Sequence, residues 1–130
     1  MTNFEAVAKF MVCGDQLGSE DLNRLTPSFP EQRVRDLRRR LIEEEVQELW
    51  DAEDADDITE IADALTDILY VVYGMGLAYG INLDKCFAEV QRSNMSKVVE
   101  GKLLKAPNGK VLKPDTYSPP NLEKVLFPFS

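Results

Sequence analysis

Apolar residues recur every three to four positions over four stretches of the chain, and this spacing predicts amphipathic α-helices. Thr2 and Glu5 have the spacing of a capping box at the start of the first stretch, and Gly14 is suited to end it. Pro30 suits the first turn of the second. The expected helices cover residues 3–13, about 30–52, 58 to about 79, and 83 to about 92. The sequence therefore predicts an all-α fold with four helices.

The remainder of the chain lacks this period and is rich in Lys, Pro and Gly. Its Ala-Pro-Asn-Gly sequence at residues 106–109 predicts a turn between two short strands at residues 102–105 and 110–113. We expect a single domain over residues 1–130, with a helical core over about 1–95 and an irregular C-terminal tail over about 96–130.

Acidic residues break the pattern of the second helix. At about 100° per residue, its core-facing stripe places Glu45 near the centre and Glu48 on one flank. A buried carboxylate without a partner costs several kcal/mol or more. We therefore expect a compensating group next to Glu45. The stripe consists of Val34, Leu41, Glu45, Leu49 and Ala52.

The third helix has two contrasting sides. One carries acidic residues that lie within roughly 60° of one another by the helical period, namely Asp56, Glu60, Asp63 and Asp67. The opposite side is apolar: Ile58, Ile61, Leu65, Ile68, Leu69, Val72, Met75 and Tyr79. Beyond Asp67 the helix is apolar nearly all round, which predicts burial by a second subunit in so short a chain.

Composition excludes several functions. Fifteen basic and 23 acidic residues give a net charge of −8, which argues against nucleic-acid binding and suits a protein that holds cations. No membrane span or secretory signal is apparent, so we expect a cytoplasmic protein without a membrane partner. Cys13 and Cys86 are interpreted as buried free thiols. The absence of histidine excludes histidine-based nucleophile systems, zinc ligands and general bases.

Carboxylates at helical spacing on two consecutive helices predict a metal site. The second helix contains Glu44-Glu45-x-x-Glu48, and the third contains Glu60-x-x-Asp63. Residues three apart point the same way, so the two pairs place about four carboxylates around one space. A divalent cation relieves the resulting repulsion, and an all-oxygen ligand set suits Mg²⁺, with Mn²⁺ as a substitute.

The order of these motifs resembles that of the MazG-like all-α nucleoside triphosphate pyrophosphohydrolases. This superfamily also contains phosphoribosyl-ATP pyrophosphohydrolase and the dimeric dUTPases. The segments at residues 63–74 and 89–97 are similar to further family segments, and the resemblance covers about residues 31–120. It implies a four-helix subunit in a helical-bundle homodimer, or a homotetramer. It also implies hydrolysis of a (d)NTP to (d)NMP and pyrophosphate, by attack of a metal-activated water on the α-phosphate.

The resemblance also implies roles for individual residues. Glu44 resembles the additional acidic residue of the first motif, as a metal ligand or as the group that orients the attacking water, so Glu44 and Glu45 are the catalytic candidates. Asn94 and Lys97 resemble residues that contact substrate. Glu60 follows Glu48 by only twelve positions, the short end of the family's gap. The implied metal ligands are Glu44, Glu45, Glu48, Glu60 and Asp63.

Cationic side chains are available for a phosphate-rich substrate. Lys97 is the first candidate for the leaving pyrophosphate. Lys102, Lys110 and Lys113 are further candidates, although solvated surface is the favoured interpretation of each; of these we retain Lys113. The arginines of the second helix are interpreted mainly as a solvated face, with Arg38 the one aligned with the Glu45 stripe.

Alternative interpretations remain open at this point. Asp67 is either an additional or outer ligand or a salt-bridge partner of an arginine. Phosphoribosyl-ATP hydrolysis in histidine biosynthesis uses the same scaffold with a different pocket. A non-catalytic, cation-binding helical dimer would need no phosphate-contacting segment such as residues 94–97. A Nudix hydrolase is disfavoured because its glycines are missing.

Overall fold

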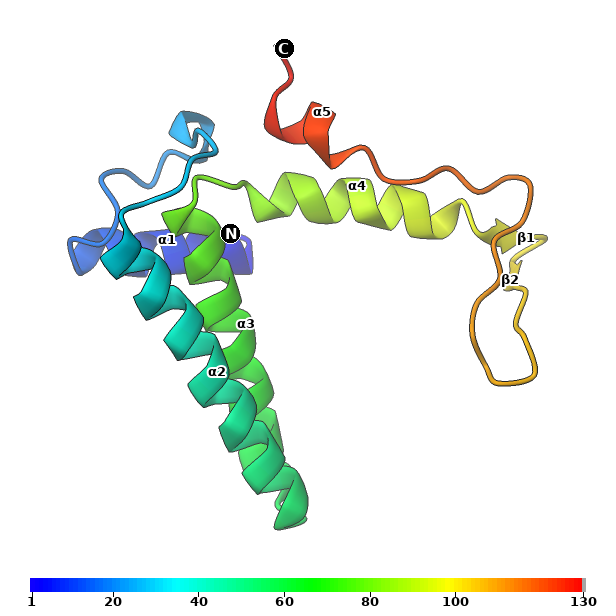
Figure 1. Cartoon of the computed structure of the whole chain (residues 1–130), viewed down its shortest axis with the longest axis horizontal. Helices are drawn as coiled ribbons and strands as arrows, with labels where there is room; N and C mark the ends of the chain where they lie inside the picture. Colours follow the sequence, from blue (N-terminus) through cyan, green and yellow to red (C-terminus); the bar gives the residue numbers. More distant parts are fainter. Residues whose placement is uncertain (130) are drawn as a thin grey trace. The chain divides into compact units, whose positions relative to one another are not determined.

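A computed structural model describes residues 1–129 and is mostly helical, as predicted (Figure 1). The four long helices are α1 (Asn3–Cys13), α2 (Gln32–Asp54), α3 (Ile58–Ala78) and α4 (Leu83–Met95). The chain divides into two compact units, Met1–Leu83 and Asp84–Ser130, which are described separately. The expectation of a single domain stays a prediction. Shorter elements are η1 (Leu22–Arg24), β1 (Val98–Val99), β2 (Lys102–Leu103) and α5 (Leu122–Leu126).

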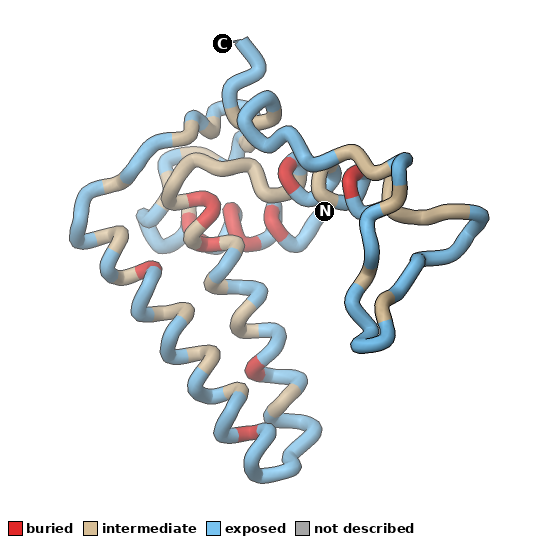
Figure 2. Tube along the Cα trace, turned by 45° about the vertical axis from the view of Figure 1, so that its right-hand side comes forward, coloured by how far each residue is buried: buried red, intermediate tan, exposed pale blue. Residues whose placement is uncertain are grey.

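The start of α1 is fixed by the predicted capping box. The hydroxyl of Thr2 accepts a hydrogen bond from the backbone N–H of Glu5 at 3.1 Å, and the Glu5 carboxylate accepts one from the Thr2 N–H at 2.7 Å. The apolar face of α1 packs on Leu77 near the end of α3, with Tyr73 half-buried beside it. Figure 2 shows most of the buried positions of this unit in these two segments. The buried residues of α1 are Phe4, Val7, Ala8 and Met11. Both cysteines are free, but only Cys86 is buried as predicted, because Cys13 lies at the exposed end of α1.

Helices α2 and α3 form an α-helical hairpin and lie side by side (Figure 1). The prediction that Pro30 lies in the first turn of α2 was wrong, because Pro30 precedes the N-cap. The N-cap is Glu31, whose carbonyl accepts the N–H groups of Val34 and Arg35. Asp57 caps α3 by accepting the Glu60 N–H at 3.1 Å. Asp56 therefore belongs to the turn, with φ of 53°, and not to the acidic side of α3 as expected.

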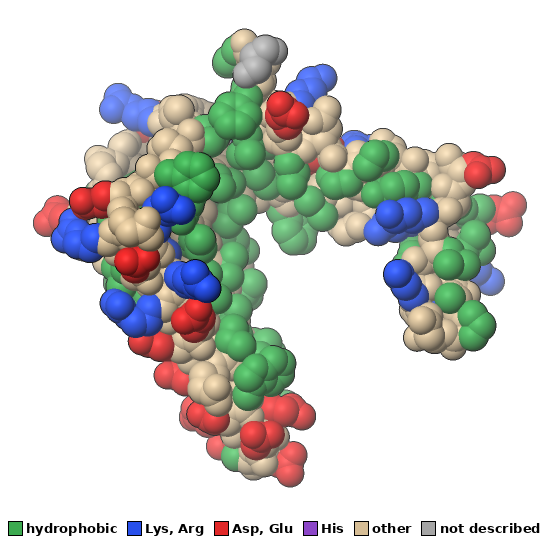
Figure 3. Space-filling model, in the orientation of Figure 1, with side chains coloured by type: hydrophobic (Ala, Val, Ile, Leu, Met, Phe, Trp, Pro, Cys, Tyr) green, Lys and Arg blue, Asp and Glu red, His purple; other side chains and the backbone are tan. Residues whose placement is uncertain are grey.

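The apolar side of α3 is largely exposed within a single chain. Ile58 is 78% exposed, Leu65 48% and Leu69 51%. Figure 3 shows hydrophobic side chains along the hairpin and acidic ones gathered at its turn. By length and composition α3 could also cross a membrane, a test that core helices of soluble proteins pass as well.

The second unit differs in detail from the predicted tail. Helix α4 runs three residues further than expected, to Met95. Strand β2 pairs antiparallel with β1 rather than with residues 110–113, because Glu100 and Gly101 at positive φ make a two-residue hairpin turn. The two predicted strands are joined only by the bridge of Lys105 with Val111 around the predicted turn.

Gly80 follows the end of α3 in a left-handed conformation and lies close to the backbone of Thr26. Its φ is +68°, and a Cβ there would overlap the carbonyl oxygen of Thr26. Gly80→Ala should therefore lower the free energy of unfolding by more than the roughly 1–2 kcal/mol expected for a left-handed residue alone. Gly101→Ala is the control, because Gly101 has φ of +76° but no neighbouring atom within 4 Å of a Cβ. Urea denaturation measures both, and equal losses would contradict the overlap.

Candidate metal centre

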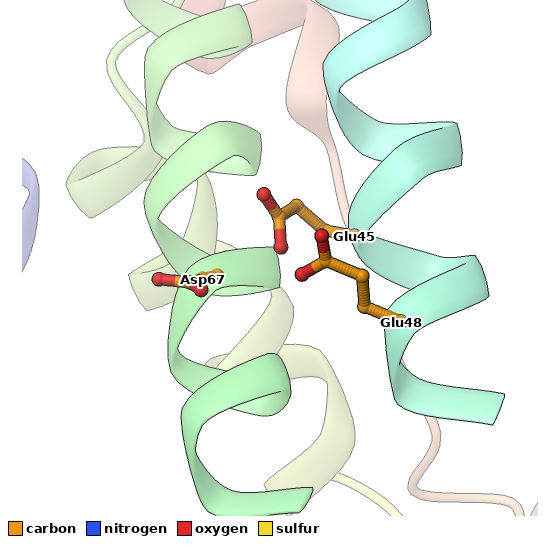
Figure 4. Close-up of side chains that lie close together, drawn as sticks. All are labelled: Glu45, Glu48 and Asp67. Carbon is orange, nitrogen blue, oxygen red and sulfur yellow. The ribbon is translucent and has the colours of Figure 1, made fainter. Parts of the chain in front are cut away.

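Three carboxylates from the two helices of the hairpin converge. Glu45 and Glu48 lie one turn apart on α2 and extend toward α3, which carries Asp67 (Figure 4). Each contributes an oxygen, and these oxygens all lie within 4.8 Å of one another. Glu45 and Asp67 are half-buried, whereas Glu48 is exposed. Such a cluster of carboxylates is the kind of ligand set that a hard divalent cation prefers.

Glu45 is the most perturbed of these groups. Its Oε2 atom is buried and has no hydrogen-bond partner among the described residues. Burial, followed by the neighbouring carboxyl of Glu48 and the charges of Asp67 and Asp63, raises the pKa of Glu45 to about 7. The pKa of Asp67 is raised as well, by burial and then by Asp63 and Glu48. The cluster therefore resists carrying its full negative charge unless a cation compensates it.

The predicted ligands of α3 lie at different distances from the turn of the hairpin. Asp63 is exposed and lies one turn before Asp67, near enough to raise the pKa of both Glu45 and Asp67. Glu60 is one turn further toward the hairpin turn. There it lines a shallow hollow of about 300 Å³ together with Glu48 and Asp57. Glu48 thus lines this hollow and also belongs to the converged cluster.

Glu44 lies outside this cluster in the single chain. Its carboxylate is exposed and is 3.9 Å from the Nε atom of Arg40. Glu43 is similarly exposed and paired with Arg39 at 3.2 Å. The catalytic and metal-ligand roles predicted for Glu44 therefore stay predictions.

The position of Asp67 favours one of the two roles that the sequence left open. No arginine pairs with it in residues 1–129, and it lies with Glu45 and Glu48 instead. The sequence carried a signal for this, since Asp67 follows Asp63 by four residues and so shares its side of the helix.

The predicted substrate-contacting residues lie together in the second unit. The Lys97 ammonium donates a hydrogen bond to the Asn94 side-chain oxygen at 3.2 Å. The ammonium groups of Lys97 and Lys113 lie 5.7 Å and 5.0 Å from the centre of the Tyr117 ring. Lys97 and Lys113 thus form a small cationic cluster around one aromatic ring, and Asn94 is bonded to Lys97.

Comparison with known proteins identifies the family. The sequence profile of phosphoribosyl-ATP pyrophosphohydrolase matches residues 14–94, more than half of the chain. The chain therefore belongs to this family, within the MazG-like all-α superfamily. An uncharacterized protein of Acanthamoeba polyphaga mimivirus, L479, is 46% identical over 84 residues, which is 64% of this chain and 33% of the relative. The chain thus spans about a third of that relative's length.

Members of this family are nucleotide pyrophosphohydrolases, which are hydrolases that act on phosphoanhydride bonds. The family is metal-dependent, and the acidic cluster of the hairpin could bind a metal ion. The cluster also fits a cation on its own chemistry, because it consists of oxygen donors and holds the buried, unpartnered Oε2 of Glu45.

The raised pKa of Glu45 predicts how the metal-free protein responds to pH. Because the folded-state pKa lies above the ordinary 4.5, the stability gained from protonated Glu45 is fully present below about pH 4.5 and is lost as the pH rises through about 7. Glu45→Gln removes this loss. In EDTA the variant should be more stable than the wild type at pH 8, by up to about 3 kcal/mol, and no more stable at pH 4.5.

The control is Glu53→Gln, which makes the same charge change at an exposed position of α2. Thermal and urea unfolding across this pH range measure both variants. An equal response of Glu45→Gln and Glu53→Gln would show that net charge, and not the cluster, governs the effect.

Proposed function

We propose that this protein hydrolyses a nucleoside triphosphate to the monophosphate and pyrophosphate, with Mg²⁺ as its cofactor. The observation that carries the proposal is the convergence of Glu45, Glu48 and Asp67, with an unpartnered buried oxygen on Glu45. Mg²⁺ suits an all-carboxylate site, and Mn²⁺ would be accepted by the same oxygens.

The acidic residues would act by holding and orienting. Glu45, Glu48 and Asp67 would hold the cation, with Asp63 and Glu60 as further ligands along α3. When bound, the cation would neutralise phosphate charge, polarise the α-phosphorus and lower the pKa of water. Glu44, close to Glu45 in sequence and exposed, is our candidate for orienting the attacking water. Positioning and charge neutralisation supply most of the rate in phosphoryl transfer.

The cationic cluster of the second unit is our candidate for phosphate contact. Lys97 is held by Asn94, so its ammonium is positioned before a ligand arrives. Lys113 adds a second charge next to Tyr117. No carboxylate pairs with either lysine in the described part of the chain, so both charges are available to a phosphate.

Hydrolysis of phosphoribosyl-ATP is the second candidate, and the matching family profile bears its name. The acidic cluster would serve both substrates, because both present a phosphoanhydride to the cation. The base and sugar thus distinguish the two candidates, and a substrate panel is the direct test. A non-catalytic cation-binding dimer has less support, because the family consists of hydrolases.

Activity should depend on both the cation and the cluster. A panel of canonical and damaged (d)NTPs with phosphoribosyl-ATP, assayed for pyrophosphate release, should show turnover with Mg²⁺ and none in EDTA. Glu48→Gln should reduce turnover by at least about 100-fold, because even outer residues of metal sites contribute ~10–100-fold. Glu43→Gln is the control, since Glu43 is exposed and paired with Arg39. Equal turnover in EDTA, or full activity of Glu48→Gln, would refute the proposal.

We also propose that the apolar side of α3 is covered by a second copy of the chain. Leu65, Leu69 and Val72 are exposed and follow one another along this side at helical spacing. Light scattering at micromolar concentration should therefore give at least a dimeric mass. Leu69→Lys should weaken the association, whereas Leu104→Lys should not, because Leu104 is comparably exposed but lies outside α3. A monomeric wild type would contradict the proposal.

A further inference from the structure

A cavity of about 850 Å³ lies beside the first half of α2, away from the acidic cluster of Glu45, Glu48 and Asp67. It is formed by residues that follow α1, by α2 and by the end of α3. Its size is typical of sites for nucleotide-sized ligands. Three arginines and two aspartates line it. Two of the arginines pair with neighbouring glutamates, so Arg38 is the one arginine of the lining without a carboxylate partner among the described residues. Its polar and charged lining residues are Asp15, Gln16, Arg33, Asp36, Arg38 and Arg40.

Arg38 is the unusual member of this lining. It is only 6% exposed, and its Nε atom has no hydrogen-bond partner among the described residues. Its Nη2 atom donates to the Gln16 side-chain oxygen at 3.5 Å, the outer limit of a hydrogen bond. No carboxylate pairs with it in residues 1–129, and burial lowers the pKa of its guanidinium. A buried cation without an anionic partner is strongly destabilising.

The guanidinium of Arg38 occupies a space that exists only because the facing residue of α3 is a glycine. Gly74 of α3 faces Arg38, and a Cβ at Gly74 would lie 2.7 Å from the Nη1 atom. Alanine would otherwise favour the helix over glycine by about 1 kcal/mol. The glycine therefore permits the guanidinium to lie against α3.

We propose that this cavity binds a phosphate group of a nucleotide-sized ligand through Arg38. A guanidinium presents a planar fork of N–H donors that matches phosphate oxygens, and a phosphate would supply the anion that the buried charge lacks. Gln16 contributes an amide at the same place, and its weak bond to Arg38 is easily exchanged for one to a ligand. Arg33 and Arg40 add exposed charge, partly shared with Glu31 and Glu44.

The position of Arg38 along α2 admits two sources for that phosphate. Arg38 and Glu45 are seven residues apart on one side of the helix, which is a separation of about 10 Å. In phosphoribosyl-ATP, the second candidate substrate, the phosphate on the added ribose is separate from the triphosphate and could reach this distance, a case that rests on the proposed function. A separate phosphorylated molecule could also occupy the cavity, which has room for one.

Direct binding measurements without metal separate this proposal from the hydrolase activity. Inorganic phosphate and a nucleoside monophosphate are titrated calorimetrically in EDTA into the full chain. Wild type should bind, and Arg38→Gln should bind at least tenfold more weakly. Arg39→Gln is the matched control, because it makes the same charge change on α2 at an exposed arginine that does not line the cavity. Gly74→Ala keeps the charge but displaces the guanidinium, so it should also weaken binding.

Each outcome is decisive. No binding of either probe to wild type, or equal affinities of wild type, Arg38→Gln and Gly74→Ala, overturns the proposal while leaving the pyrophosphate-release assay unaffected. Loss of self-association by Arg38→Gln without any phosphate binding also overturns it, and assigns the arginine to a carboxylate of a second copy. If phosphate binds, competition with the hydrolysed nucleotide identifies the phosphate as part of the substrate, and non-competitive behaviour identifies a separate ligand.

Discussion

The burial of the Glu45 carboxyl between α2 and α3 is the constraint on which the interpretation of the hairpin depends. A helix pair of this size would be more stable with leucine at that position, because an unpartnered buried oxygen offsets part of the gain from packing. Three other carboxylates, those of Glu48, Asp63 and Asp67, lie close enough to raise the cost further. Protonation of Glu45 relieves this cost at low pH, and above the pKa of about 7 a bound cation would relieve it instead. The local instability is therefore consistent with the family's metal dependence.

Much of this hairpin could be predicted from the sequence, because helical period and capping residues are local signals. The Glu45 stripe and the capping box of α1 were visible as patterns, and the structure confirms α1 over the predicted residues. The sequence alone could not determine which acidic residue of α3 lies next to Glu45 and Glu48. It depends on how α2 and α3 are paired, which determines that Asp67 lies opposite Glu45.

The second unit was less predictable for a related reason. Helix propensity and helical period do not predict a segment whose structure is determined by individual turns. The β1–β2 pair depends on Glu100 and Gly101 at positive φ, and the sequence Glu-Gly is a weaker signal than Asn-Gly. The closeness of Lys97 and Lys113 likewise depends on the path of the intervening loop, which brings both to Tyr117.

One stripe of α2 carries two groups of opposite charge, the buried Arg38 and the half-buried Glu45. They are about 10 Å apart along the helix, too far for direct compensation, and each has an atom without a hydrogen-bond partner among the described residues. A chain selected for stability alone would have exchanged both for apolar residues, which fit such positions at no electrostatic cost. Their retention is consistent with ligands at both ends: a cation at Glu45, as we propose for catalysis, and an anion at Arg38. A phosphorylated nucleotide with its metal ion supplies both charges at once, so a single bound molecule could satisfy the whole stripe.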